Sequence, residues 1–266
     1  MKKENIDINS QIFKLAVTAA KAAVSASGTY LKKQFELQNQ IISFNGSHEK
    51  IEDDVVAENI ILDTLKKYIP TFSHISEETQ NHTEDEIQFI IDPIEGTSNY
   101  VRGIPFFGTQ IAIMYQKTLA ASFIYEPIRD ILYYASLGQG AYMNTKKLNC
   151  NLEQPLKQTI LSGGAGTNTE NKLKVLKKIE KLMPHMRSVR IYGSTGLELA
   201  YVSQGKLGAH VNIGSKVYDF TPGVLLVREA GGEVYNLEGK EWTVNDVNMI
   251  ASSKNHISEV LSLLNQ

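Results

Sequence analysis

Cysteine is nearly absent from this sequence: Cys150 is the one cysteine among 266 residues. An internal disulfide is therefore excluded, and this cysteine usage fits a reducing compartment. Long apolar runs are missing too, since no stretch approaches the ~18 consecutive apolar residues of a membrane-spanning helix. The polar segment Met1–Ser10 lacks the apolar core of a secretory signal peptide. We therefore expect a cytoplasmic protein with no membrane partner.

An excess of charge of one sign is also lacking, because 27 basic residues face 29 acidic ones and the net charge is −2. This balance gives no electrostatic reason to bind nucleic acid, and we expect no nucleic-acid partner. The six histidines show no metal-ligand spacing, which disfavours zinc. Hydrophobic residues make up 42% of the chain, enough for the sizeable core of a compact enzyme.

The stretch Ile90–Tyr100 carries the strongest signal of chemistry. It opens as a buried strand that we expect to stop at Asp92, because Pro93 has no N–H to give to a sheet ladder. The carboxylates of Asp92 and Glu95 can turn with the carbonyl of Ile94 towards one point. Such a cage of oxygen atoms suits a hard cation such as Mg²⁺.

A helix should open directly behind this turn. Gly96 permits a tight bend or the close approach of a ligand. Thr97 and Ser98 would begin the helix, whose free N–H groups favour a phosphate. The alternative stays open on these residues alone, since Asp-Pro and Glu-Gly are ordinary turn dipeptides that mostly carry no chemistry.

A second informative stretch, Lys216–Gly232, places Asp219 directly before an apolar helix predicted over Thr221–Ala230. Pro222 lies in the first turn of that helix and Gly follows its end. As an alternative, Asp219 or Thr221 is simply the N-cap residue of the helix.

A pair of acidic residues, Glu77 and Glu78, follows the short predicted strand Phe72–Ile75. Adjacent acids at such a place are usually solvated surface. Their distance from Asp92 along the chain also suits two neighbouring strands whose ends share one metal site.

Together these stretches resemble the inositol monophosphatase superfamily of Mg²⁺-dependent phosphatases. Its signatures are a Glu-Glu pair, then Asp-Pro-Ile-Asp-Gly-Thr, then Trp-Asp at the start of a helix that ends in Glu-Ala-Gly-Gly. The resemblance covers nearly the whole chain, with the motifs in family order. It departs at two positions: Glu95 replaces the usual Asp, and Tyr218 replaces the usual Trp.

The resemblance implies two or three Mg²⁺ ions as cofactors. One ion would be held by Glu77, Asp92 and the carbonyl of Ile94, where it would activate a water molecule. A second ion, held by Asp92, Glu95 and Asp219, would stabilise the leaving oxygen.

The resemblance also implies which residues act on the substrate. The implied catalytic residues are Asp54, Glu77 and Thr97, with Asp54 orienting Thr97 and Thr97 positioning the water. The implied substrate-binding residues are Gly96, Thr97, Ser98, Gly193, Ser194, Thr195 and Asn212. From the residues alone, Asp54 could merely favour its helix dipole, and Gly193–Thr195 could be only a capping turn.

The implied function is hydrolysis of a small phosphorylated substrate, with inositol monophosphate or a related sugar or polyol phosphate first. Asn212 stands where inositol-selective members often carry Glu, which weakens the case for inositol selectivity. Fructose 1,6-bisphosphate, NADP and nucleotide bisphosphates are alternative substrates, as in broad-activity prokaryotic members. A non-catalytic regulatory or binding protein is the alternative from another class, suggested by Glu95. A homodimer is common in the family and is expected here.

The pattern of elements predicts an α+β fold in a single domain over residues 1–266, with two lobes of about 1–144 and 145–266. The first lobe would place two long helices on a mostly antiparallel sheet, and the second would be a smaller α/β unit. The resemblance implies that these layers stack as an αβαβα sandwich.

Four local expectations accompany this fold. The first long helix should begin after a cap at Asn9 or Ser10, and the second should run over Asp53–Lys67. Ser43–Asp53 should be an exposed loop, and Ser162–Thr167 a turn between a strand and a helix. The second helix should bury its apolar residues, which are Val55, Val56, Ile60, Ile61 and Leu65.

Overall fold

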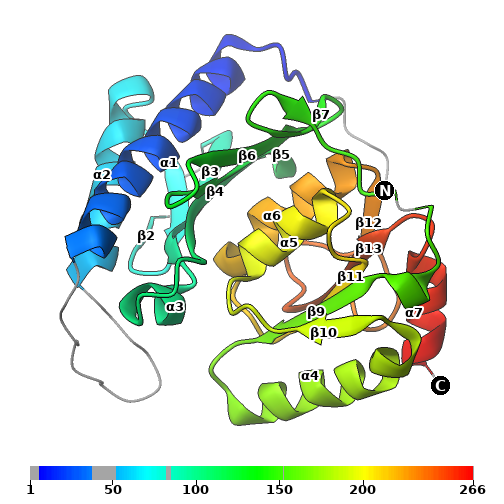
Figure 1. Ribbon diagram of the computed structural model, residues 1–266. Coiled ribbons are helices and arrows are strands. Elements are labelled where there is room, and N and C mark those ends of the chain that lie inside the picture. The colour runs from blue at the N-terminus through cyan, green and yellow to red at the C-terminus, as the bar shows by residue number, and fades with distance from the viewer. Residues whose placement is uncertain (1–5, 38–51, 82–84, 152, 266) are drawn as a thin grey trace.

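Five layers stack in the order helix, sheet, helix, sheet, helix in the computed structural model (Figure 1). The structure describes residues 6–37, 52–81, 85–151 and 153–265. From the first layer to the last, the long helices are α1 (Gln11–Leu37) and α2 (Glu52–Tyr68), then α5 (Thr195–Ser203) and α6 (Val217–Glu229), then α4 (Thr169–Leu182) and α7 (Ile257–Leu264). The expected αβαβα sandwich is confirmed.

The first sheet has eight strands in the order β2-β1-β3-β4-β5-β6-β7-β8. Its strands are β1 (Ser73–Ser76), β2 (Gln80–Asn81), β3 (Ile87–Glu95), β4 (Gly108–Tyr115), β5 (Thr118–Glu126), β6 (Ile131–Ser136), β7 (Gly140–Met143) and β8 (Lys146–Lys147). Only the β1–β3 pair is parallel among the described pairs. The expected mostly antiparallel sheet of the first lobe is therefore confirmed.

The second sheet has five strands in the order β10-β9-β11-β13-β12. These are β9 (Ile160–Ala165), β10 (Ser188–Arg190), β11 (Ala209–Ile213), β12 (Gly232–Tyr235) and β13 (Asn248–Ser253). A short helix, α3 (Thr97–Val101), follows β3, and two 3₁₀ turns lie at Leu156–Gln158 and Met183–His185. No helix in the described part of the chain is both long and apolar enough to cross a membrane.

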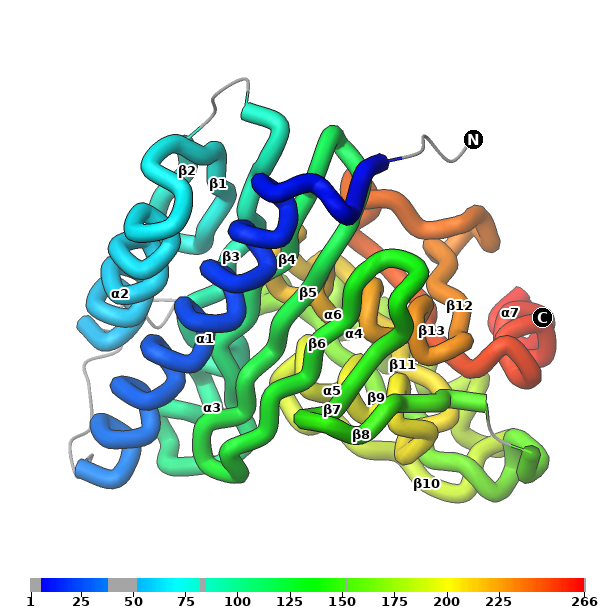
Figure 2. Tube along the Cα trace, turned by 90° about the horizontal axis from the view of Figure 1, so that it is seen from above, coloured from blue at the N-terminus to red at the C-terminus, as the bar shows by residue number. Residues whose placement is uncertain are grey.

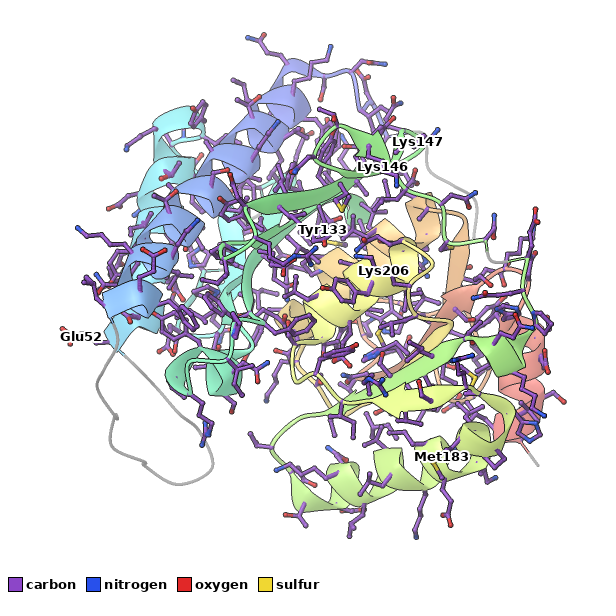
Figure 3. All side chains as sticks on the ribbon, in the orientation of Figure 1. Glu52, Tyr133, Lys146, Lys147, Met183 and Lys206 are labelled. Atoms are coloured by element: carbon purple, nitrogen blue, oxygen red, sulfur yellow. The ribbon has the colours of Figure 1, made fainter. Side chains whose placement is uncertain are left out.

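Three large apolar cores hold the layers together, and a smaller fourth one includes Tyr100 of α3 and Phe107. The first lies between α1, α2 and the first sheet, and it includes the fully buried Phe89. The second fills the space between the sheets around α5 and α6, where side chains from both sheets meet (Figure 3). Tyr133 reaches into this core from β6. The third core, under α4 and α7, includes Leu161.

Helix α1 begins as expected, because the hydroxyl of Ser10 accepts the Phe13 N–H at 3.3 Å. Small side chains let it lie close to its neighbours: Ala16, Ala19, Ala20 and Ala23 are all fully buried. Figure 2 shows α1 lying across β4 and β5 with α2 beside it. A substitution that changes the size of a side chain on this face should lower the free energy of unfolding, because protein interiors are packed as densely as crystals.

Helix α2 presents a different face from the one expected. Val55 is 49% exposed, so its predicted burial is wrong. Two acidic residues, Asp54 and Glu58, face inward instead, in line with the buried Ile61 and Leu65. The four residues are spaced so that they share one face of α2. The two acids lie in the first half of the helix, nearest the functional site. Of the loop expected at Ser43–Asp53, residues 43–51 lie outside the described part, and the last two residues belong to α2.

Strand β3 does not stop at Asp92 as expected but continues to Glu95. Asp92 pairs with Gln110 and Glu95 pairs with Gly108, so two residues of β3 oppose one residue of β4. This is a β-bulge, which accommodates Pro93 because the extra residue needs no ladder hydrogen bond. The bulge bends the strand between the two acidic side chains.

Two further boundaries differ from expectation. Helix α6 begins at Val217, so Asp219 lies inside its first turn and Lys216 is the N-cap residue. The Gly-rich stretch expected as a turn belongs to β9 as far as Ala165. Gly163 is needed there because a Cβ would lie 2.7 Å from the side chain of Ile179.

Candidate functional site

The acidic stretches of the sequence meet where β1 and β3 end. These two strands are parallel neighbours, and Ser76 pairs with Ile91. The next residues along the two strands, Glu77 and Asp92, are therefore adjacent across the sheet. The first turn of α6 brings Asp219 to the same place, because the Gln110 side chain on β4 donates hydrogen bonds to its carbonyl oxygen.

Asp92 lies at the centre of a cluster of like charges. It is 3% exposed, and burial is the main cause that raises the pKa of its carboxyl group. The charges of Glu77, Asp219, Glu95 and Asp54 raise this pKa further. Five carboxyl groups from β3, α2, α6 and the end of β1 thus share one electrostatic environment.

This donor set fits a divalent cation. The Oδ1 atom of Asp92 is buried and has no hydrogen-bond partner among the described residues. A buried acceptor without a partner costs free energy, which a bound cation would recover. The described part of the chain contains no group of three or more His, Cys, Asp or Glu side chains that could by itself hold a metal ion. Mg²⁺ does not require one, because it is usually held by one or two carboxylates together with water and substrate phosphates.

Glu95 reaches past the centre of the cluster to the amino end of α5. Its Oε2 atom accepts a short hydrogen bond from the Ser194 hydroxyl, and its carboxylate also accepts the backbone N–H groups of Thr195 and Gly196. Burial raises the pKa of Glu95 to about 8, and the charge of Asp219 adds to the shift, whereas these hydrogen bonds lower it. The charge of Asp219 therefore acts on Glu95 across the cluster.

Asp219 is fixed by its own helix. Its Oδ2 atom accepts the Lys216 N–H at 2.7 Å, which completes half of a capping box. Burial raises the pKa of Asp219 to about 6, against the lowering effects of this bond and of the Lys216 charge. Gln110 donates to the carbonyl oxygens of Tyr218 and Asp219 at 2.8 and 2.9 Å, so β4 holds the start of α6 in place.

The turn after β3 holds the other expected ligands. The Thr97 hydroxyl donates to the carbonyl oxygen of Ile94 at 2.8 Å. Gly96 caps α3 with φ of 90°, a conformation that a residue with a Cβ rarely adopts. A Cβ there would also lie 3.2 Å from the Phe106 carbonyl oxygen and from Ser194. Ser98 is exposed.

The residues expected to bind substrate on the second lobe come together. Gly193, with φ of 76°, and Ser194 lead into α5, which begins at Thr195 as expected. Asn212 on β11 is fully buried, and its Nδ2 atom donates to the Thr195 hydroxyl at 3.0 Å. The α3 residue Asn99 joins this region to the first lobe by donating to the Tyr192 carbonyl oxygen at 2.7 Å.

Two residues of the site were not identified from the sequence. Glu58 on α2 accepts the Ser76 hydroxyl at 2.6 Å, the Glu78 N–H at 3.3 Å and a short bond from the Thr79 hydroxyl. It therefore fixes the turn that carries Glu77. The available signal was its helical spacing from Asp54, which places two acids on an apolar face.

The second unidentified residue is Gln110, which is fully buried in the middle of β4. An amide side chain in the mostly apolar run Thr109–Tyr115 was a signal of a specific partner, because buried amides are almost always hydrogen-bonded. No local pattern indicates that this partner is the start of α6, more than 100 residues away.

Comparisons with known proteins agree with this architecture. The sequence profile of the inositol monophosphatase family matches residues 9–266. The Nus factor SuhB of Salmonella typhimurium strain LT2 is 32% identical over 251 residues, which cover 92% of this chain and 94% of the relative. Inositol monophosphatase 1 of Solanum lycopersicum is 30% identical over 253 residues, covering 92% and 91%. The crystal structure of the extragenic suppressor protein suhB from Bartonella henselae superposes with a TM-score of 0.85 at 30% identity, covering 97% and 99%.

Proposed function

This chain belongs to the inositol monophosphatase family, and from that premise we propose that it hydrolyses a small phosphate monoester with Mg²⁺ as its cofactor. The observation that supports this most is the cluster around Asp92, where four other carboxyl groups raise the pKa of a buried acid. Such a cluster is unfavourable in the protein alone, and a divalent cation would make it favourable.

We assign the ligands as the family resemblance implies. Glu77, Asp92 and the Ile94 carbonyl would hold one ion, and Asp92, Glu95 and Asp219 a second. Bound Mg²⁺ supplies positive charge next to the phosphate and makes a water molecule more acidic. The one-carbon difference between Glu and Asp at position 95 lengthens the reach of that ligand by ~1.5 Å. We expect the second ion to bind more weakly for this reason.

The protein's own groups orient the reaction. The Thr97 hydroxyl would position the attacking water, and Asp54, which is buried at the start of α2, would orient that hydroxyl. The backbone N–H groups of residues 96–98 would face the phosphate. Gln110 and Glu58 do not touch the substrate; they are positioning residues for Asp219 and Glu77.

Inositol monophosphate is the first candidate substrate, in keeping with the name of the Solanum lycopersicum relative. Related sugar or polyol phosphates, fructose 1,6-bisphosphate, NADP and nucleotide bisphosphates follow. We also propose a cytoplasmic homodimer without a nucleic-acid partner. A regulatory protein without catalysis is the second candidate, because Glu95 binds the amino end of α5 and another relative is named a Nus factor.

A panel assay tests the proposal. Phosphate release from inositol 1-phosphate, glycerol 2-phosphate, fructose 1,6-bisphosphate, NADP and adenosine 3′,5′-bisphosphate is measured with Mg²⁺ and with EDTA. We expect Mg²⁺-dependent turnover of at least one ester and its loss, by ~10²-fold or more, in Asp92→Asn and Asp219→Asn. A folded parent that is inactive on every ester would favour the regulatory candidate, and near-normal turnover by both variants would refute the site.

A further inference from the structure

Glu95 occupies hydrogen-bond donors that a substrate could otherwise use. Its carboxylate is 5% exposed and accepts from the Ser194 hydroxyl and from the N–H groups of Thr195 and Gly196. Ser194 is the N-cap residue of the nine-residue helix α5, but its side chain caps nothing within that helix. The hydroxyl points to β3 instead, so the first lobe supplies the acceptor for the second.

A second carboxylate fixes the same loop from the other side. Glu198, fully buried on α5, accepts the Tyr192 N–H at 3.4 Å and also a backbone bond from Ser194. The loop of residues 192–196 is therefore held between Glu95 and Glu198. The Ser194 hydroxyl and the N–H groups of Thr195 and Gly196 can donate to a new acceptor only if the Glu95 carboxylate is displaced.

An acceptor atom without a partner lies next to these donors. Asn212 is fully buried, and its Nδ2 atom donates to the Thr195 hydroxyl. Its Oδ1 atom has no hydrogen-bond partner among the described residues. Gly164 on β9 lines the same place, because a Cβ there would lie 2.9 Å from the Asn212 amide nitrogen. The amino end of α5 thus adjoins a buried amide oxygen for which the described residues supply no donor.

These contacts carry an inference about specificity that rests on the proposed function. We propose that Glu95 is the specificity-determining residue of this enzyme, and that it narrows the candidate substrates by disfavouring those whose alcohol part bears a second phosphate, such as fructose 1,6-bisphosphate and the nucleotide bisphosphates. A second phosphate that reached α5 would need the donors of residues 194–196, which Glu95 already uses. Displacing Glu95 would leave a buried carboxylate without its hydrogen bonds, which is costly. Monoesters with a plain polyol as the alcohol part do not require this displacement.

The conservative variant Glu95→Asp tests the inference. It keeps a carboxylate for the cation but withdraws it by ~1.5 Å, which frees the donors of α5. The measured quantity is the ratio of kcat/KM for adenosine 3′,5′-bisphosphate to kcat/KM for glycerol 2-phosphate. We expect this ratio to rise by about tenfold or more in Glu95→Asp, the effect of one or two hydrogen bonds to a charged group.

Two further variants control the measurement. Glu86→Asp makes the same change at an exposed residue just before β3, and it should leave the ratio unchanged. Ser194→Ala removes one freed donor, so the double variant with Glu95→Asp should lose most of the gain. A ratio that stays within twofold of the parent in Glu95→Asp overturns the inference.

The outcomes separate this inference from the proposed function. A parent that hydrolyses glycerol 2-phosphate with Mg²⁺ supports the proposed function whatever the ratio does. If Glu95→Asp turns over neither ester, calorimetric titration with adenosine 3′,5′-bisphosphate in the presence of Mg²⁺ decides. Binding at least tenfold tighter to Glu95→Asp than to the parent supports the exclusion by Glu95, and equal binding overturns it.

Discussion

At the scale of single residues, Thr97 joins the turn after β3 to the expected chemistry. Its hydroxyl lies 2.8 Å from the Ile94 carbonyl oxygen, one of the proposed cation ligands. A group that orients water acts in the transition state more than on the bound substrate. We expect Thr97→Ala to lower kcat by ~10²-fold while KM changes by less than threefold.

The matched variant for this measurement is Thr97→Ser, which retains the hydroxyl and should retain most of the turnover. Steady-state kinetics on the best substrate of the panel gives both constants. An effect of Thr97→Ala confined to KM would mean that Thr97 binds the substrate and does not position the water.

The residues that the sequence revealed and those that it hid differ in one physical respect. Asp92 and Glu95 flank the bulge of β3, and Asp219 lies in the first turn of α6, so Pro and Gly mark the backbone around all three. Glu58 lies within helix α2 and Gln110 within strand β4. There the sequence pattern shows only that a polar side chain faces the interior. Their partners are set by tertiary packing, which a single sequence does not display.

At the scale of elements, α2 acts as a support for the Glu77 turn. Glu58 accepts three hydrogen bonds from residues 76–79 and is 2% exposed. Glu58→Gln keeps the size of the side chain but turns one acceptor into a donor that faces donors. We expect the free energy of unfolding to fall by ~1–3 kcal/mol. The Mg²⁺ concentration for half-maximal activity should rise severalfold while kcat at saturating Mg²⁺ stays within threefold of the parent.

Urea unfolding and a Mg²⁺ titration of activity measure the two effects. Asp63→Asn is the control on the same helix, because its side chain is 72% exposed and its ion pair with Lys66 spans 3.9 Å. Loss of stability without any change in the Mg²⁺ requirement would show that Glu58 supports only the fold.

Element order was largely predictable, and element ends were less so. The cap signal before α1 located its start, and the pattern of α2 located both of its ends to within one residue. The bulge at Pro93 was not predicted. Pro93 cannot donate a ladder hydrogen bond, but β3 continues past it because two residues of β3 pair with one residue of β4. The early start of α6 was missed because Asp219 serves as the third residue of a capping box and not as the cap.

At the scale of the whole molecule, the first lobe and α5–α6 together enclose a carboxylate cluster that is unfavourable without a cation. The pKa of Glu95 is about 8 and that of Asp219 about 6 in the folded chain, against ~4 in an unfolded chain. The folded state therefore binds more protons than the unfolded state between these values. Without a cation, the free energy of unfolding should fall as pH rises from about 4 to about 8.

Mg²⁺ should restore the free energy of unfolding at the pH values at which the carboxylates are ionised. At ten times its dissociation constant, an ion that binds only the folded state adds ~1.4 kcal/mol, or a rise in Tm of roughly 3–5 °C for a chain of this size. The rise should be present at pH 8 and much smaller at pH 5, where protons compete for the same groups.

The most direct test of a cation site at Asp92 is therefore the Tm of the parent and of Asp92→Asn at pH 8, each with Mg²⁺ and with EDTA at equal ionic strength. We expect Mg²⁺ to raise the Tm of the parent by several degrees and to leave that of Asp92→Asn unchanged. In EDTA, Asp92→Asn should be at least as stable as the parent, because it removes one charge from the cluster. An equal Mg²⁺ effect on both proteins, or none on the folded parent, would contradict a cation site at Asp92.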